Sequence, residues 1–165
     1  MTKSWPPRLT TAISEKRNAA DGATVYRETD RALAYLLMRL RIGASLFGHG
    51  LNRLPKLGAF HAQLTAEFKT SILPAILVSV SSYVLPFAEF VTGLLLLAGA
   101  LTRVAAVAAG LVMIILVFGS KAIEHFNVIG DQLVHASFLA AVVAFRSHNK
   151  YSVDHLLSSR RQPTG

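Results

Sequence analysis

The sequence predicts an all-α protein, a membrane-embedded four-helix bundle with an amphipathic interfacial helix between the first two spans. Hydrophobic residues make up 52% of the 165 residues and mean hydropathy is +0.44. Charged residues make up only 16%, against about 25% in soluble domains. No charge lies between 104 and 119, and Glu89 is the only one between 72 and 101. Such long uncharged runs are typical of membrane helices, which pair their backbone polar groups internally.

Four apolar segments are each close to the ~20 residues that cross about 30 Å of hydrocarbon. The expected spans cover residues 32–51, 76–101, 104–120 and 128–145. In the second span, Pro74 stands at the mouth and Pro86 lies inside. The sequence therefore predicts four helical crossings, of which the third is short.

Between the first two spans, apolar residues recur every three or four positions, which places them on one helical face. They are Leu57, Phe60, Leu64, Phe68 and Ile72. We expect a helix lying in the outer interface and covering the bundle. A re-entrant segment is the alternative, which the charges of Glu67 and Lys69 disfavour.

Three regions are expected along the chain. Residues 1–30 read as a polar cytoplasmic tail, mobile and with at most a short helix, because they are too polar to bury a core. Residues 31–157 form the membrane domain, and residues 158–165 a flexible C-terminal tail. With both termini in the cytoplasm, most Lys and Arg lie on the inner side, as the positive-inside rule requires. The outer side then holds Arg53, Lys56, Lys69 and Lys121.

Composition also excludes several functions. The chain has no cysteine, so disulfides, thiolate metal sites and cysteine catalysis are excluded. Its formal net charge of +8 gathers in the tails and forms no basic stripe interleaved with aromatic residues. We therefore expect a lipid bilayer and no nucleic acid as a partner.

Ionisable residues inside spans are costly and often functional. Arg39 and Arg41 lie in the first span and Glu89 in the second, and these three are the candidate catalytic residues. Arg39 precedes Leu51, and Glu89 follows Ile76, by nearly the same number of residues, which predicts equal depths at 1.5 Å per residue. An ion pair between them would either fix helix packing or take part in proton or quinone chemistry.

A second group of polar residues is expected at the outer ends of the spans. It consists of His49, His125, Asp131 and His135. Asp131 and His135 are four apart and share a helical face, so the carboxylate could fix the tautomer of the histidine. The group could bind a quinone head group, a metal or a haem, or simply hold interfacial histidines. No fixed metal-ligand spacing occurs, so we assign no metal, and haem is the weaker alternative to quinone.

Three stretches resemble the DoxX family of small integral membrane proteins. RLRIGASLFGHGLNRL is similar to the first span of that family, with Arg53 where lysine is usual. PFAEFVTGLLLLAGALTR resembles its second-span signature, and NKYSVDHLL resembles its closing segment. The residues that fit are Arg39, Gly43, Phe47, His49, Gly50, Leu54, Pro86, Glu89, Gly93, Leu96, Gly99, Thr102, Arg103, Tyr151, Ser152 and Asp154.

The resemblance implies a four-helix protein of a bacterial or archaeal cytoplasmic (inner) membrane. Some members of this family are subunits of thiosulfate:quinone oxidoreductase, and others accompany quinone detoxification or oxidative-stress systems. We therefore expect an integral membrane subunit of a quinone-linked oxidoreductase or redox-stress system, with a partner subunit or a homo-oligomer. The alternative is a non-catalytic assembly subunit of a larger complex. The sequence leaves open whether the chain itself is an enzyme.

Overall fold

A computed structural model describes residues 7–159, and all regular structure within this range is helical. The elements are α1 (Pro7–Arg53), η1 (Leu54–Lys56), α2 (Leu57–Glu67), α3 (Ala75–Ala98), α4 (Thr102–Ala122), η2 (Phe126–Val128), α5 (Ile129–Ala144), η3 (Arg146–His148) and α6 (Val153–Ser159). A helix between the first two expected spans is confirmed as α2, although it ends at Glu67, so Phe68 and Ile72 of the expected helical face lie beyond it. The all-α fold is confirmed as well.

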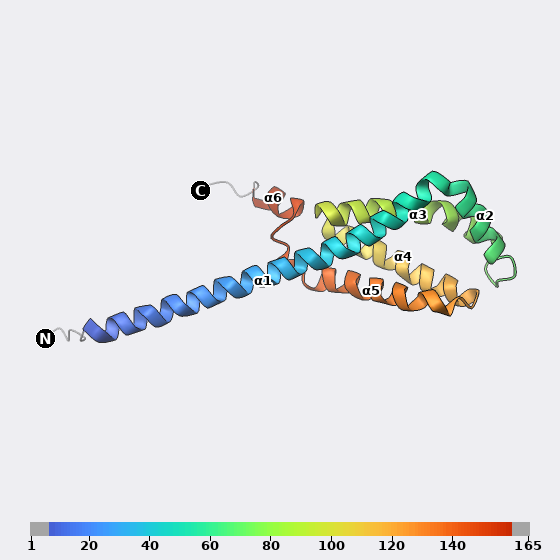
Figure 1. Ribbon diagram of the computed structural model, residues 1–165. Coiled ribbons are helices and arrows are strands. Elements are labelled where there is room, and N and C mark those ends of the chain that lie inside the picture. Colours follow the sequence, from blue (N-terminus) through green and yellow to red (C-terminus); the bar gives the residue numbers. More distant parts are fainter. Residues whose placement is uncertain (1–6, 160–165) are drawn as a thin grey trace.

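The C-terminal half of α1 forms a bundle with α3, α4 and α5 (Figure 1). Helix α1 packs on α3 and α5, and α4 packs on the same two helices. The turns after α3 and α5, together with α6, lie at one end of the bundle, here named the α6 end. The opposite end is named the α2 end.

Three segments of the described chain are long and apolar enough to cross a membrane, judged by length and composition. They are Ala75–Ala98, Thr102–Ala122 and Phe126–Ala144. Helix α1 is not among them. Its expected span includes Arg39, Arg41 and His49, and these polar side chains lower the hydropathy of the stretch.

Helix α1 differs from the sequence-based expectation at its start. It begins at Pro7 and continues without a break to Arg53, so the segment expected to be a mobile tail is helical from residue 7. Its N-terminal half extends beyond the bundle (Figure 1). Residues 1–6 and 160–165, which belong to the two expected tails, lie outside the described residues.

Proline and glycine determine where the helices of the bundle end. After Arg53 the chain tightens into η1, which contains Pro55, a residue that lacks the backbone N–H a continuing helix would need. Helix α3 ends at Gly99, whose φ of 67° is left-handed. Ala100 N–H donates to the Leu95 carbonyl at 3.0 Å, as in a Schellman cap.

Close backbone packing fixes how α1 lies along α3. A Cβ on Gly50 would lie 2.5 Å from the backbone nitrogen of Phe90, and a Cβ on Gly93 would overlap the backbone of Phe47. Helix α1 therefore ends alongside the middle of α3. The half of α3 nearer the α2 end packs against α2 instead.

The interior of the bundle combines a hydrophobic cluster with buried polar residues. The buried hydrophobic cluster consists of Tyr35, Ile42, Leu46, Leu96, Ala105, Ala106, Ala109, Met113, Leu139 and Val142. Toward the α2 end the buried positions include Ser82, Glu89 and Ser120. At the α6 end they include Arg39, Thr102 and Ser152, so buried polar groups occur at both ends of the bundle.

Candidate functional site

Glu89 is the buried carboxylate of the bundle, with 2% of its surface exposed. Its Oε2 accepts a hydrogen bond from Arg53 Nη1 at 2.5 Å. Arg53 is 30% exposed, and its guanidinium lies 5.0 Å from the centre of the Phe60 ring. Arg53, at the end of α1, therefore contacts both the Glu89 carboxylate and the Phe60 ring of α2.

The expected pairing of Glu89 with Arg39 is wrong. The prediction of equal depth assumes that both spans begin at the same level, but α1 stops near the middle of α3 and does not reach its start. The partner is Arg53, fourteen positions after Arg39. From the sequence alone, Arg53 is expected to be a charged residue in the loop after the first span. Its proximity to Glu89 becomes visible only in the structure, where Gly50 packs against α3.

Arg39 lies at the α6 end, with 2% of its surface exposed. Its Nη2 donates to the Tyr151 carbonyl at 2.8 Å, while Nε and Nη1 have no hydrogen-bond partner among the described residues. Gly99 leaves room for the guanidinium, since a Cβ at this position would overlap Nη1. A cation at the end of α3 also complements the negative end of that helix.

Arg41 is exposed and stacks over the Phe138 ring of α5, 4.5 Å from its centre. It forms no salt bridge within residues 7–159. The three residues predicted as catalytic thus occupy three separate environments. Only Glu89 lies among the buried polar groups toward the α2 end.

Two of the predicted outer residues do meet. The ring centres of His49 and His135 are 6.3 Å apart, and Ser45 Oγ lies 2.7 Å from His135 Nε2. His135 Nδ1 lies 2.7 Å from the backbone carbonyl of Asp131. A carbonyl can only accept, so Nδ1 carries the proton and a neutral ring accepts the Ser45 hydroxyl at Nε2. The tautomer is fixed by the Asp131 carbonyl and not, as expected, by its carboxylate.

His125 does not join this pair. It is exposed in the turn after α4, and no hydrogen bond or ring contact of its side chain occurs within the described part of the chain. No group of three or more His, Cys, Asp or Glu residues among residues 7–159 could hold a metal ion. Of the expected group, His49 and His135 therefore come together, with Ser45 bonded to His135.

A third polar group joins α2 to α3 and was not predicted. His61 Nδ1 lies 2.7 Å from Ser82 Oγ, and Ser82, fully buried, donates to the Ser79 carbonyl at 2.6 Å. The His61 ring stacks on Tyr83, with centres 4.9 Å apart and planes 24° apart. A sequence signal existed, because His61 directly follows the run 57–60, which has no polar side chain.

At the α6 end, Asp154 joins the end of α3 to the start of α4. Its carboxylate accepts hydrogen bonds from the N–H groups of Leu101 at 2.7 Å and Thr102 at 2.8 Å. Burial is the largest single influence on its pKa and raises it. The hydrogen bonds from Thr102 and Leu101, with the charge of Arg39, together hold the pKa below its ordinary value. This end of the molecule is a helix cap with a buried arginine beside it.

The fold and these contacts define a class, a multi-pass membrane bundle with ion-paired and hydrogen-bonded groups inside. The chain belongs to the DoxX family, whose model matches residues 34–122. This range includes Arg39, Glu89, Arg53 and His61, and it ends before α5. Neither a curated protein nor a solved structure matches the chain.

Proposed function

We propose that the protein is the membrane subunit of a quinone-linked redox system. It anchors the system in a bacterial or archaeal inner membrane and offers a polar site near the quinone head group. Both termini face the cytoplasm, so the α2 end faces outward, because most Lys and Arg then lie inside. We propose a quinone as the substrate because the sequence motifs resemble those of the DoxX family.

The observation that carries the proposal is the Glu89–Arg53 pair. Glu89 is almost fully buried and hydrogen-bonded to a single arginine. Removing one partner of a buried ion pair leaves an uncompensated buried charge, which is strongly unfavourable. Arg53 is partly exposed and sits next to the helix break at Pro55, so the pair connects the buried carboxylate with the surface of the bundle. Quinone reduction and quinol oxidation take up and release protons, and Glu89 would exchange them.

The electrons must come from elsewhere. The chain has no cysteine and no glycine-rich dinucleotide loop, so we propose that a partner subunit delivers them. The His49–His135 pair offers a second polar position toward the α2 end, where His49 has free ring nitrogens within the described contacts. It supports the same function by providing a donor for a ring carbonyl.

The substitution Glu89→Gln tests the proposal because it keeps the side-chain size and removes the exchangeable charge. Thiosulfate-dependent reduction of decylubiquinone by membranes containing the protein should fall by roughly 100-fold or more, as for lost acid–base groups. The amount of protein in the membrane should stay at the wild-type level. Glu67→Gln, on the surface of α2 and bonded only to Gln63, is the matched control and should retain full turnover.

A second function, a non-catalytic assembly subunit, is favoured by a different observation. The N-terminal half of α1 extends beyond the bundle (Figure 1), and the side chains from Thr24 to Arg31 are all exposed. Lys150 holds this helix near the bundle through an ion pair with Glu28 at 2.7 Å. A projecting helix of this kind suits contact with a partner protein. Unchanged turnover in Glu89→Gln would favour this role and reject the first.

A further inference from the structure

We propose that the groove between α4 and α5 binds one acyl chain of an anionic phospholipid, whose phosphate is held by Arg103 and Arg146 at the α6 end. This site is independent of the quinone-linked function. It is inferred from the shape of the groove, from its length and from the charges at its end.

Two helices form the groove, which has a volume of about 450 Å³. Ala106 of α4 and Leu139 of α5 line it and are buried, so the groove reaches down to the hydrophobic cluster. Small residues keep it open. A Cβ on Gly110 would meet nothing within 4 Å, and α5 contributes three alanines one turn apart, Ala136, Ala140 and Ala144. An apolar chain can therefore lie between the two helices.

The length of the groove matches one leaflet of a bilayer. Its lining runs along α4 over residues 106–114 and along α5 over residues 136–144, which is about 12 Å at a rise of 1.5 Å per residue. It begins at the α6 end, because Ala144 is the last residue of α5. Half of a hydrocarbon core of about 30 Å is about 15 Å. An acyl chain from one leaflet therefore fits, whereas a membrane-spanning helix of a second copy would need a groove about twice as long.

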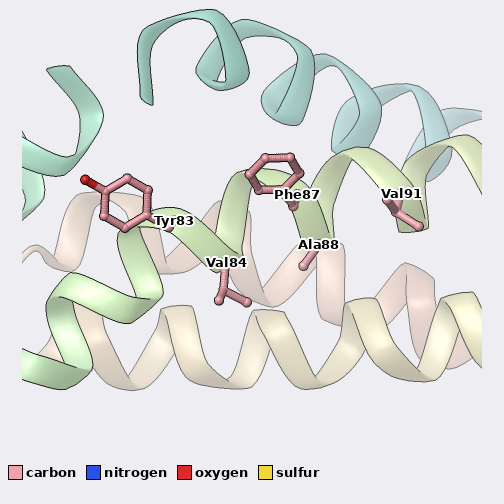
Figure 2. Close-up of a pocket in the computed structure, with 5 residues that line it drawn as sticks. All are labelled: Tyr83, Val84, Phe87, Ala88 and Val91. Atoms are coloured by element: carbon pink, nitrogen blue, oxygen red, sulfur yellow. The ribbon is translucent and has the colours of Figure 1, made fainter. Parts of the chain in front are cut away.

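An apolar depression on α3 lacks these features. Figure 2 shows that its lining residues all come from one helix, and they are Tyr83, Val84, Phe87, Ala88 and Val91. Helix α3 contains no lysine or arginine. Its own helix thus provides no cation for an anionic head group, and the groove between α4 and α5 is the better site.

Two arginines lie at the α6 end of the groove. Arg103 precedes Val107 by one turn and shares its exposed helical face. Arg146 follows the last residue of α5 by two positions. The Asn149 side chain donates to Thr102 Oγ1 at 3.2 Å, which places this turn beside the start of α4. Both arginines are exposed, and neither forms an ion pair within the described residues.

A phosphodiester with a net negative charge is the head group that fits these arginines. A guanidinium can donate two N–H groups to one phosphate, while its aliphatic stem lies along apolar surface. Basic pockets between membrane helices bind anionic lipid head groups in this way. Asp154, the acid at the start of α4, already accepts from the Leu101 and Thr102 N–H groups. A zwitterionic lipid adds a cationic group to the same phosphate and should bind more weakly.

Native mass spectrometry of the full-length protein in detergent tests the charges. Titration with phosphatidylglycerol, or with phosphatidylcholine of the same acyl chains, gives the Kd of the first bound lipid. The wild type should bind phosphatidylglycerol at least about 10-fold more tightly. The double variant Arg103→Gln/Arg146→Gln should bring this ratio close to one. The control Arg27→Gln/Arg31→Gln removes the same net charge from exposed positions on α1 and should keep the wild-type ratio.

The substitution Gly110→Leu tests the groove, because the new side chain fills open space and leucine is a better helix former than glycine. It should weaken the binding of phosphatidylglycerol by roughly 10-fold, since the chain loses apolar contact. Gly48→Leu places the same side chain in open space on α1 and should leave binding unchanged. Glycerol phosphate, which has no acyl chain, should not displace the lipid at equal concentration.

Several results would overturn the inference. They are a wild-type ratio near one, a preference that survives Arg103→Gln/Arg146→Gln, and an equal loss of preference in Arg27→Gln/Arg31→Gln. Unchanged binding in Gly110→Leu, or displacement by glycerol phosphate, would reject the acyl-chain groove. A wild-type dimer that becomes monomeric in Gly110→Leu would assign the groove to a second copy of the chain.

Discussion

At the scale of single residues, the two glycines that flank His49 have different roles. Gly50 contacts the backbone of Phe90, whereas a Cβ on Gly48 would meet nothing within 4 Å. In the FGHG stretch, Gly50 therefore packs against α3, Gly48 is exposed, and His49 lies beside His135. Of these two glycines, only Gly50 is needed to bring α1 against α3.

We predict opposite effects of alanine at these two positions. Gly50→Ala should lower the free energy of unfolding by about 1–3 kcal/mol, because the added carbon overlaps Phe90. Gly48→Ala should raise it by up to about 1 kcal/mol, since alanine is the better helix former and the space is open. Thermal unfolding of both variants in detergent, followed by circular dichroism, measures the difference. Equal midpoints would contradict the packing shown here.

The burial of single residues could be predicted from the sequence. The identity of the residue that each one contacts could not be predicted in every case. That Glu89 would be buried and paired followed from its place in an apolar run. Its partner did not, because Arg39 and Arg53 are both on α1 and the choice depends on where Pro55 ends that helix. The His49–His135 contact followed from counting toward one leaflet, but the carbonyl that fixes His135 belongs to the backbone and leaves no sequence signal.

At the scale of elements, the junction between α3 and α4 is the most tightly specified connection. Gly99 ends one helix, and Leu101 precedes the next with a left-handed φ of 47°. Since Leu101 has no side-chain oxygen, Asp154 from α6 supplies the missing acceptors for the first N–H groups of α4. A carboxylate in this position also complements the positive end of the helix.

We predict that Asp154→Ala lowers the free energy of unfolding by about 1 kcal/mol at pH 7, as the loss of a helix cap does. Folding lowers the pKa of Asp154. Its contribution is therefore complete above the pKa of the unfolded chain, about 4, and is lost as the pH falls through the lower folded value. The difference between wild type and variant should shrink below pH 4. Denaturant unfolding at several pH values measures it, with Asp30→Ala as the surface control. A difference that is constant with pH would contradict this role.

At the scale of the whole molecule, the hydrophobic cluster lies nearer the α6 end, but buried polar contacts occur at both ends of the bundle. The pairs Glu89–Arg53, Ser45–His135 and His61–Ser82 lie nearer the α2 end. At the α6 end, Arg39 donates to the Tyr151 carbonyl. The helix break at η1 lets α1 and α2 cover successive parts of α3, and the proposed function uses the polar contacts nearer the α2 end.

We predict that the α6 end of the bundle faces the cytoplasm and the α2 end faces outward. Because the sequence has no cysteine, this orientation is simple to test. Single cysteines at Val25 and Leu157, both more than half exposed, should react with a membrane-impermeant maleimide only after spheroplasts are opened. Cysteines at Thr70 and Asn127, exposed in the two turns at the α2 end, should react in intact spheroplasts. The reason is the excess of Lys and Arg at the α6 end and in the N-terminal half of α1, which favours retention in the cytoplasm. Labelling of Val25 and Leu157 from opposite sides would contradict the four crossings, and the reverse pattern at all four positions would place the Glu89 and His61 groups toward the cytoplasm.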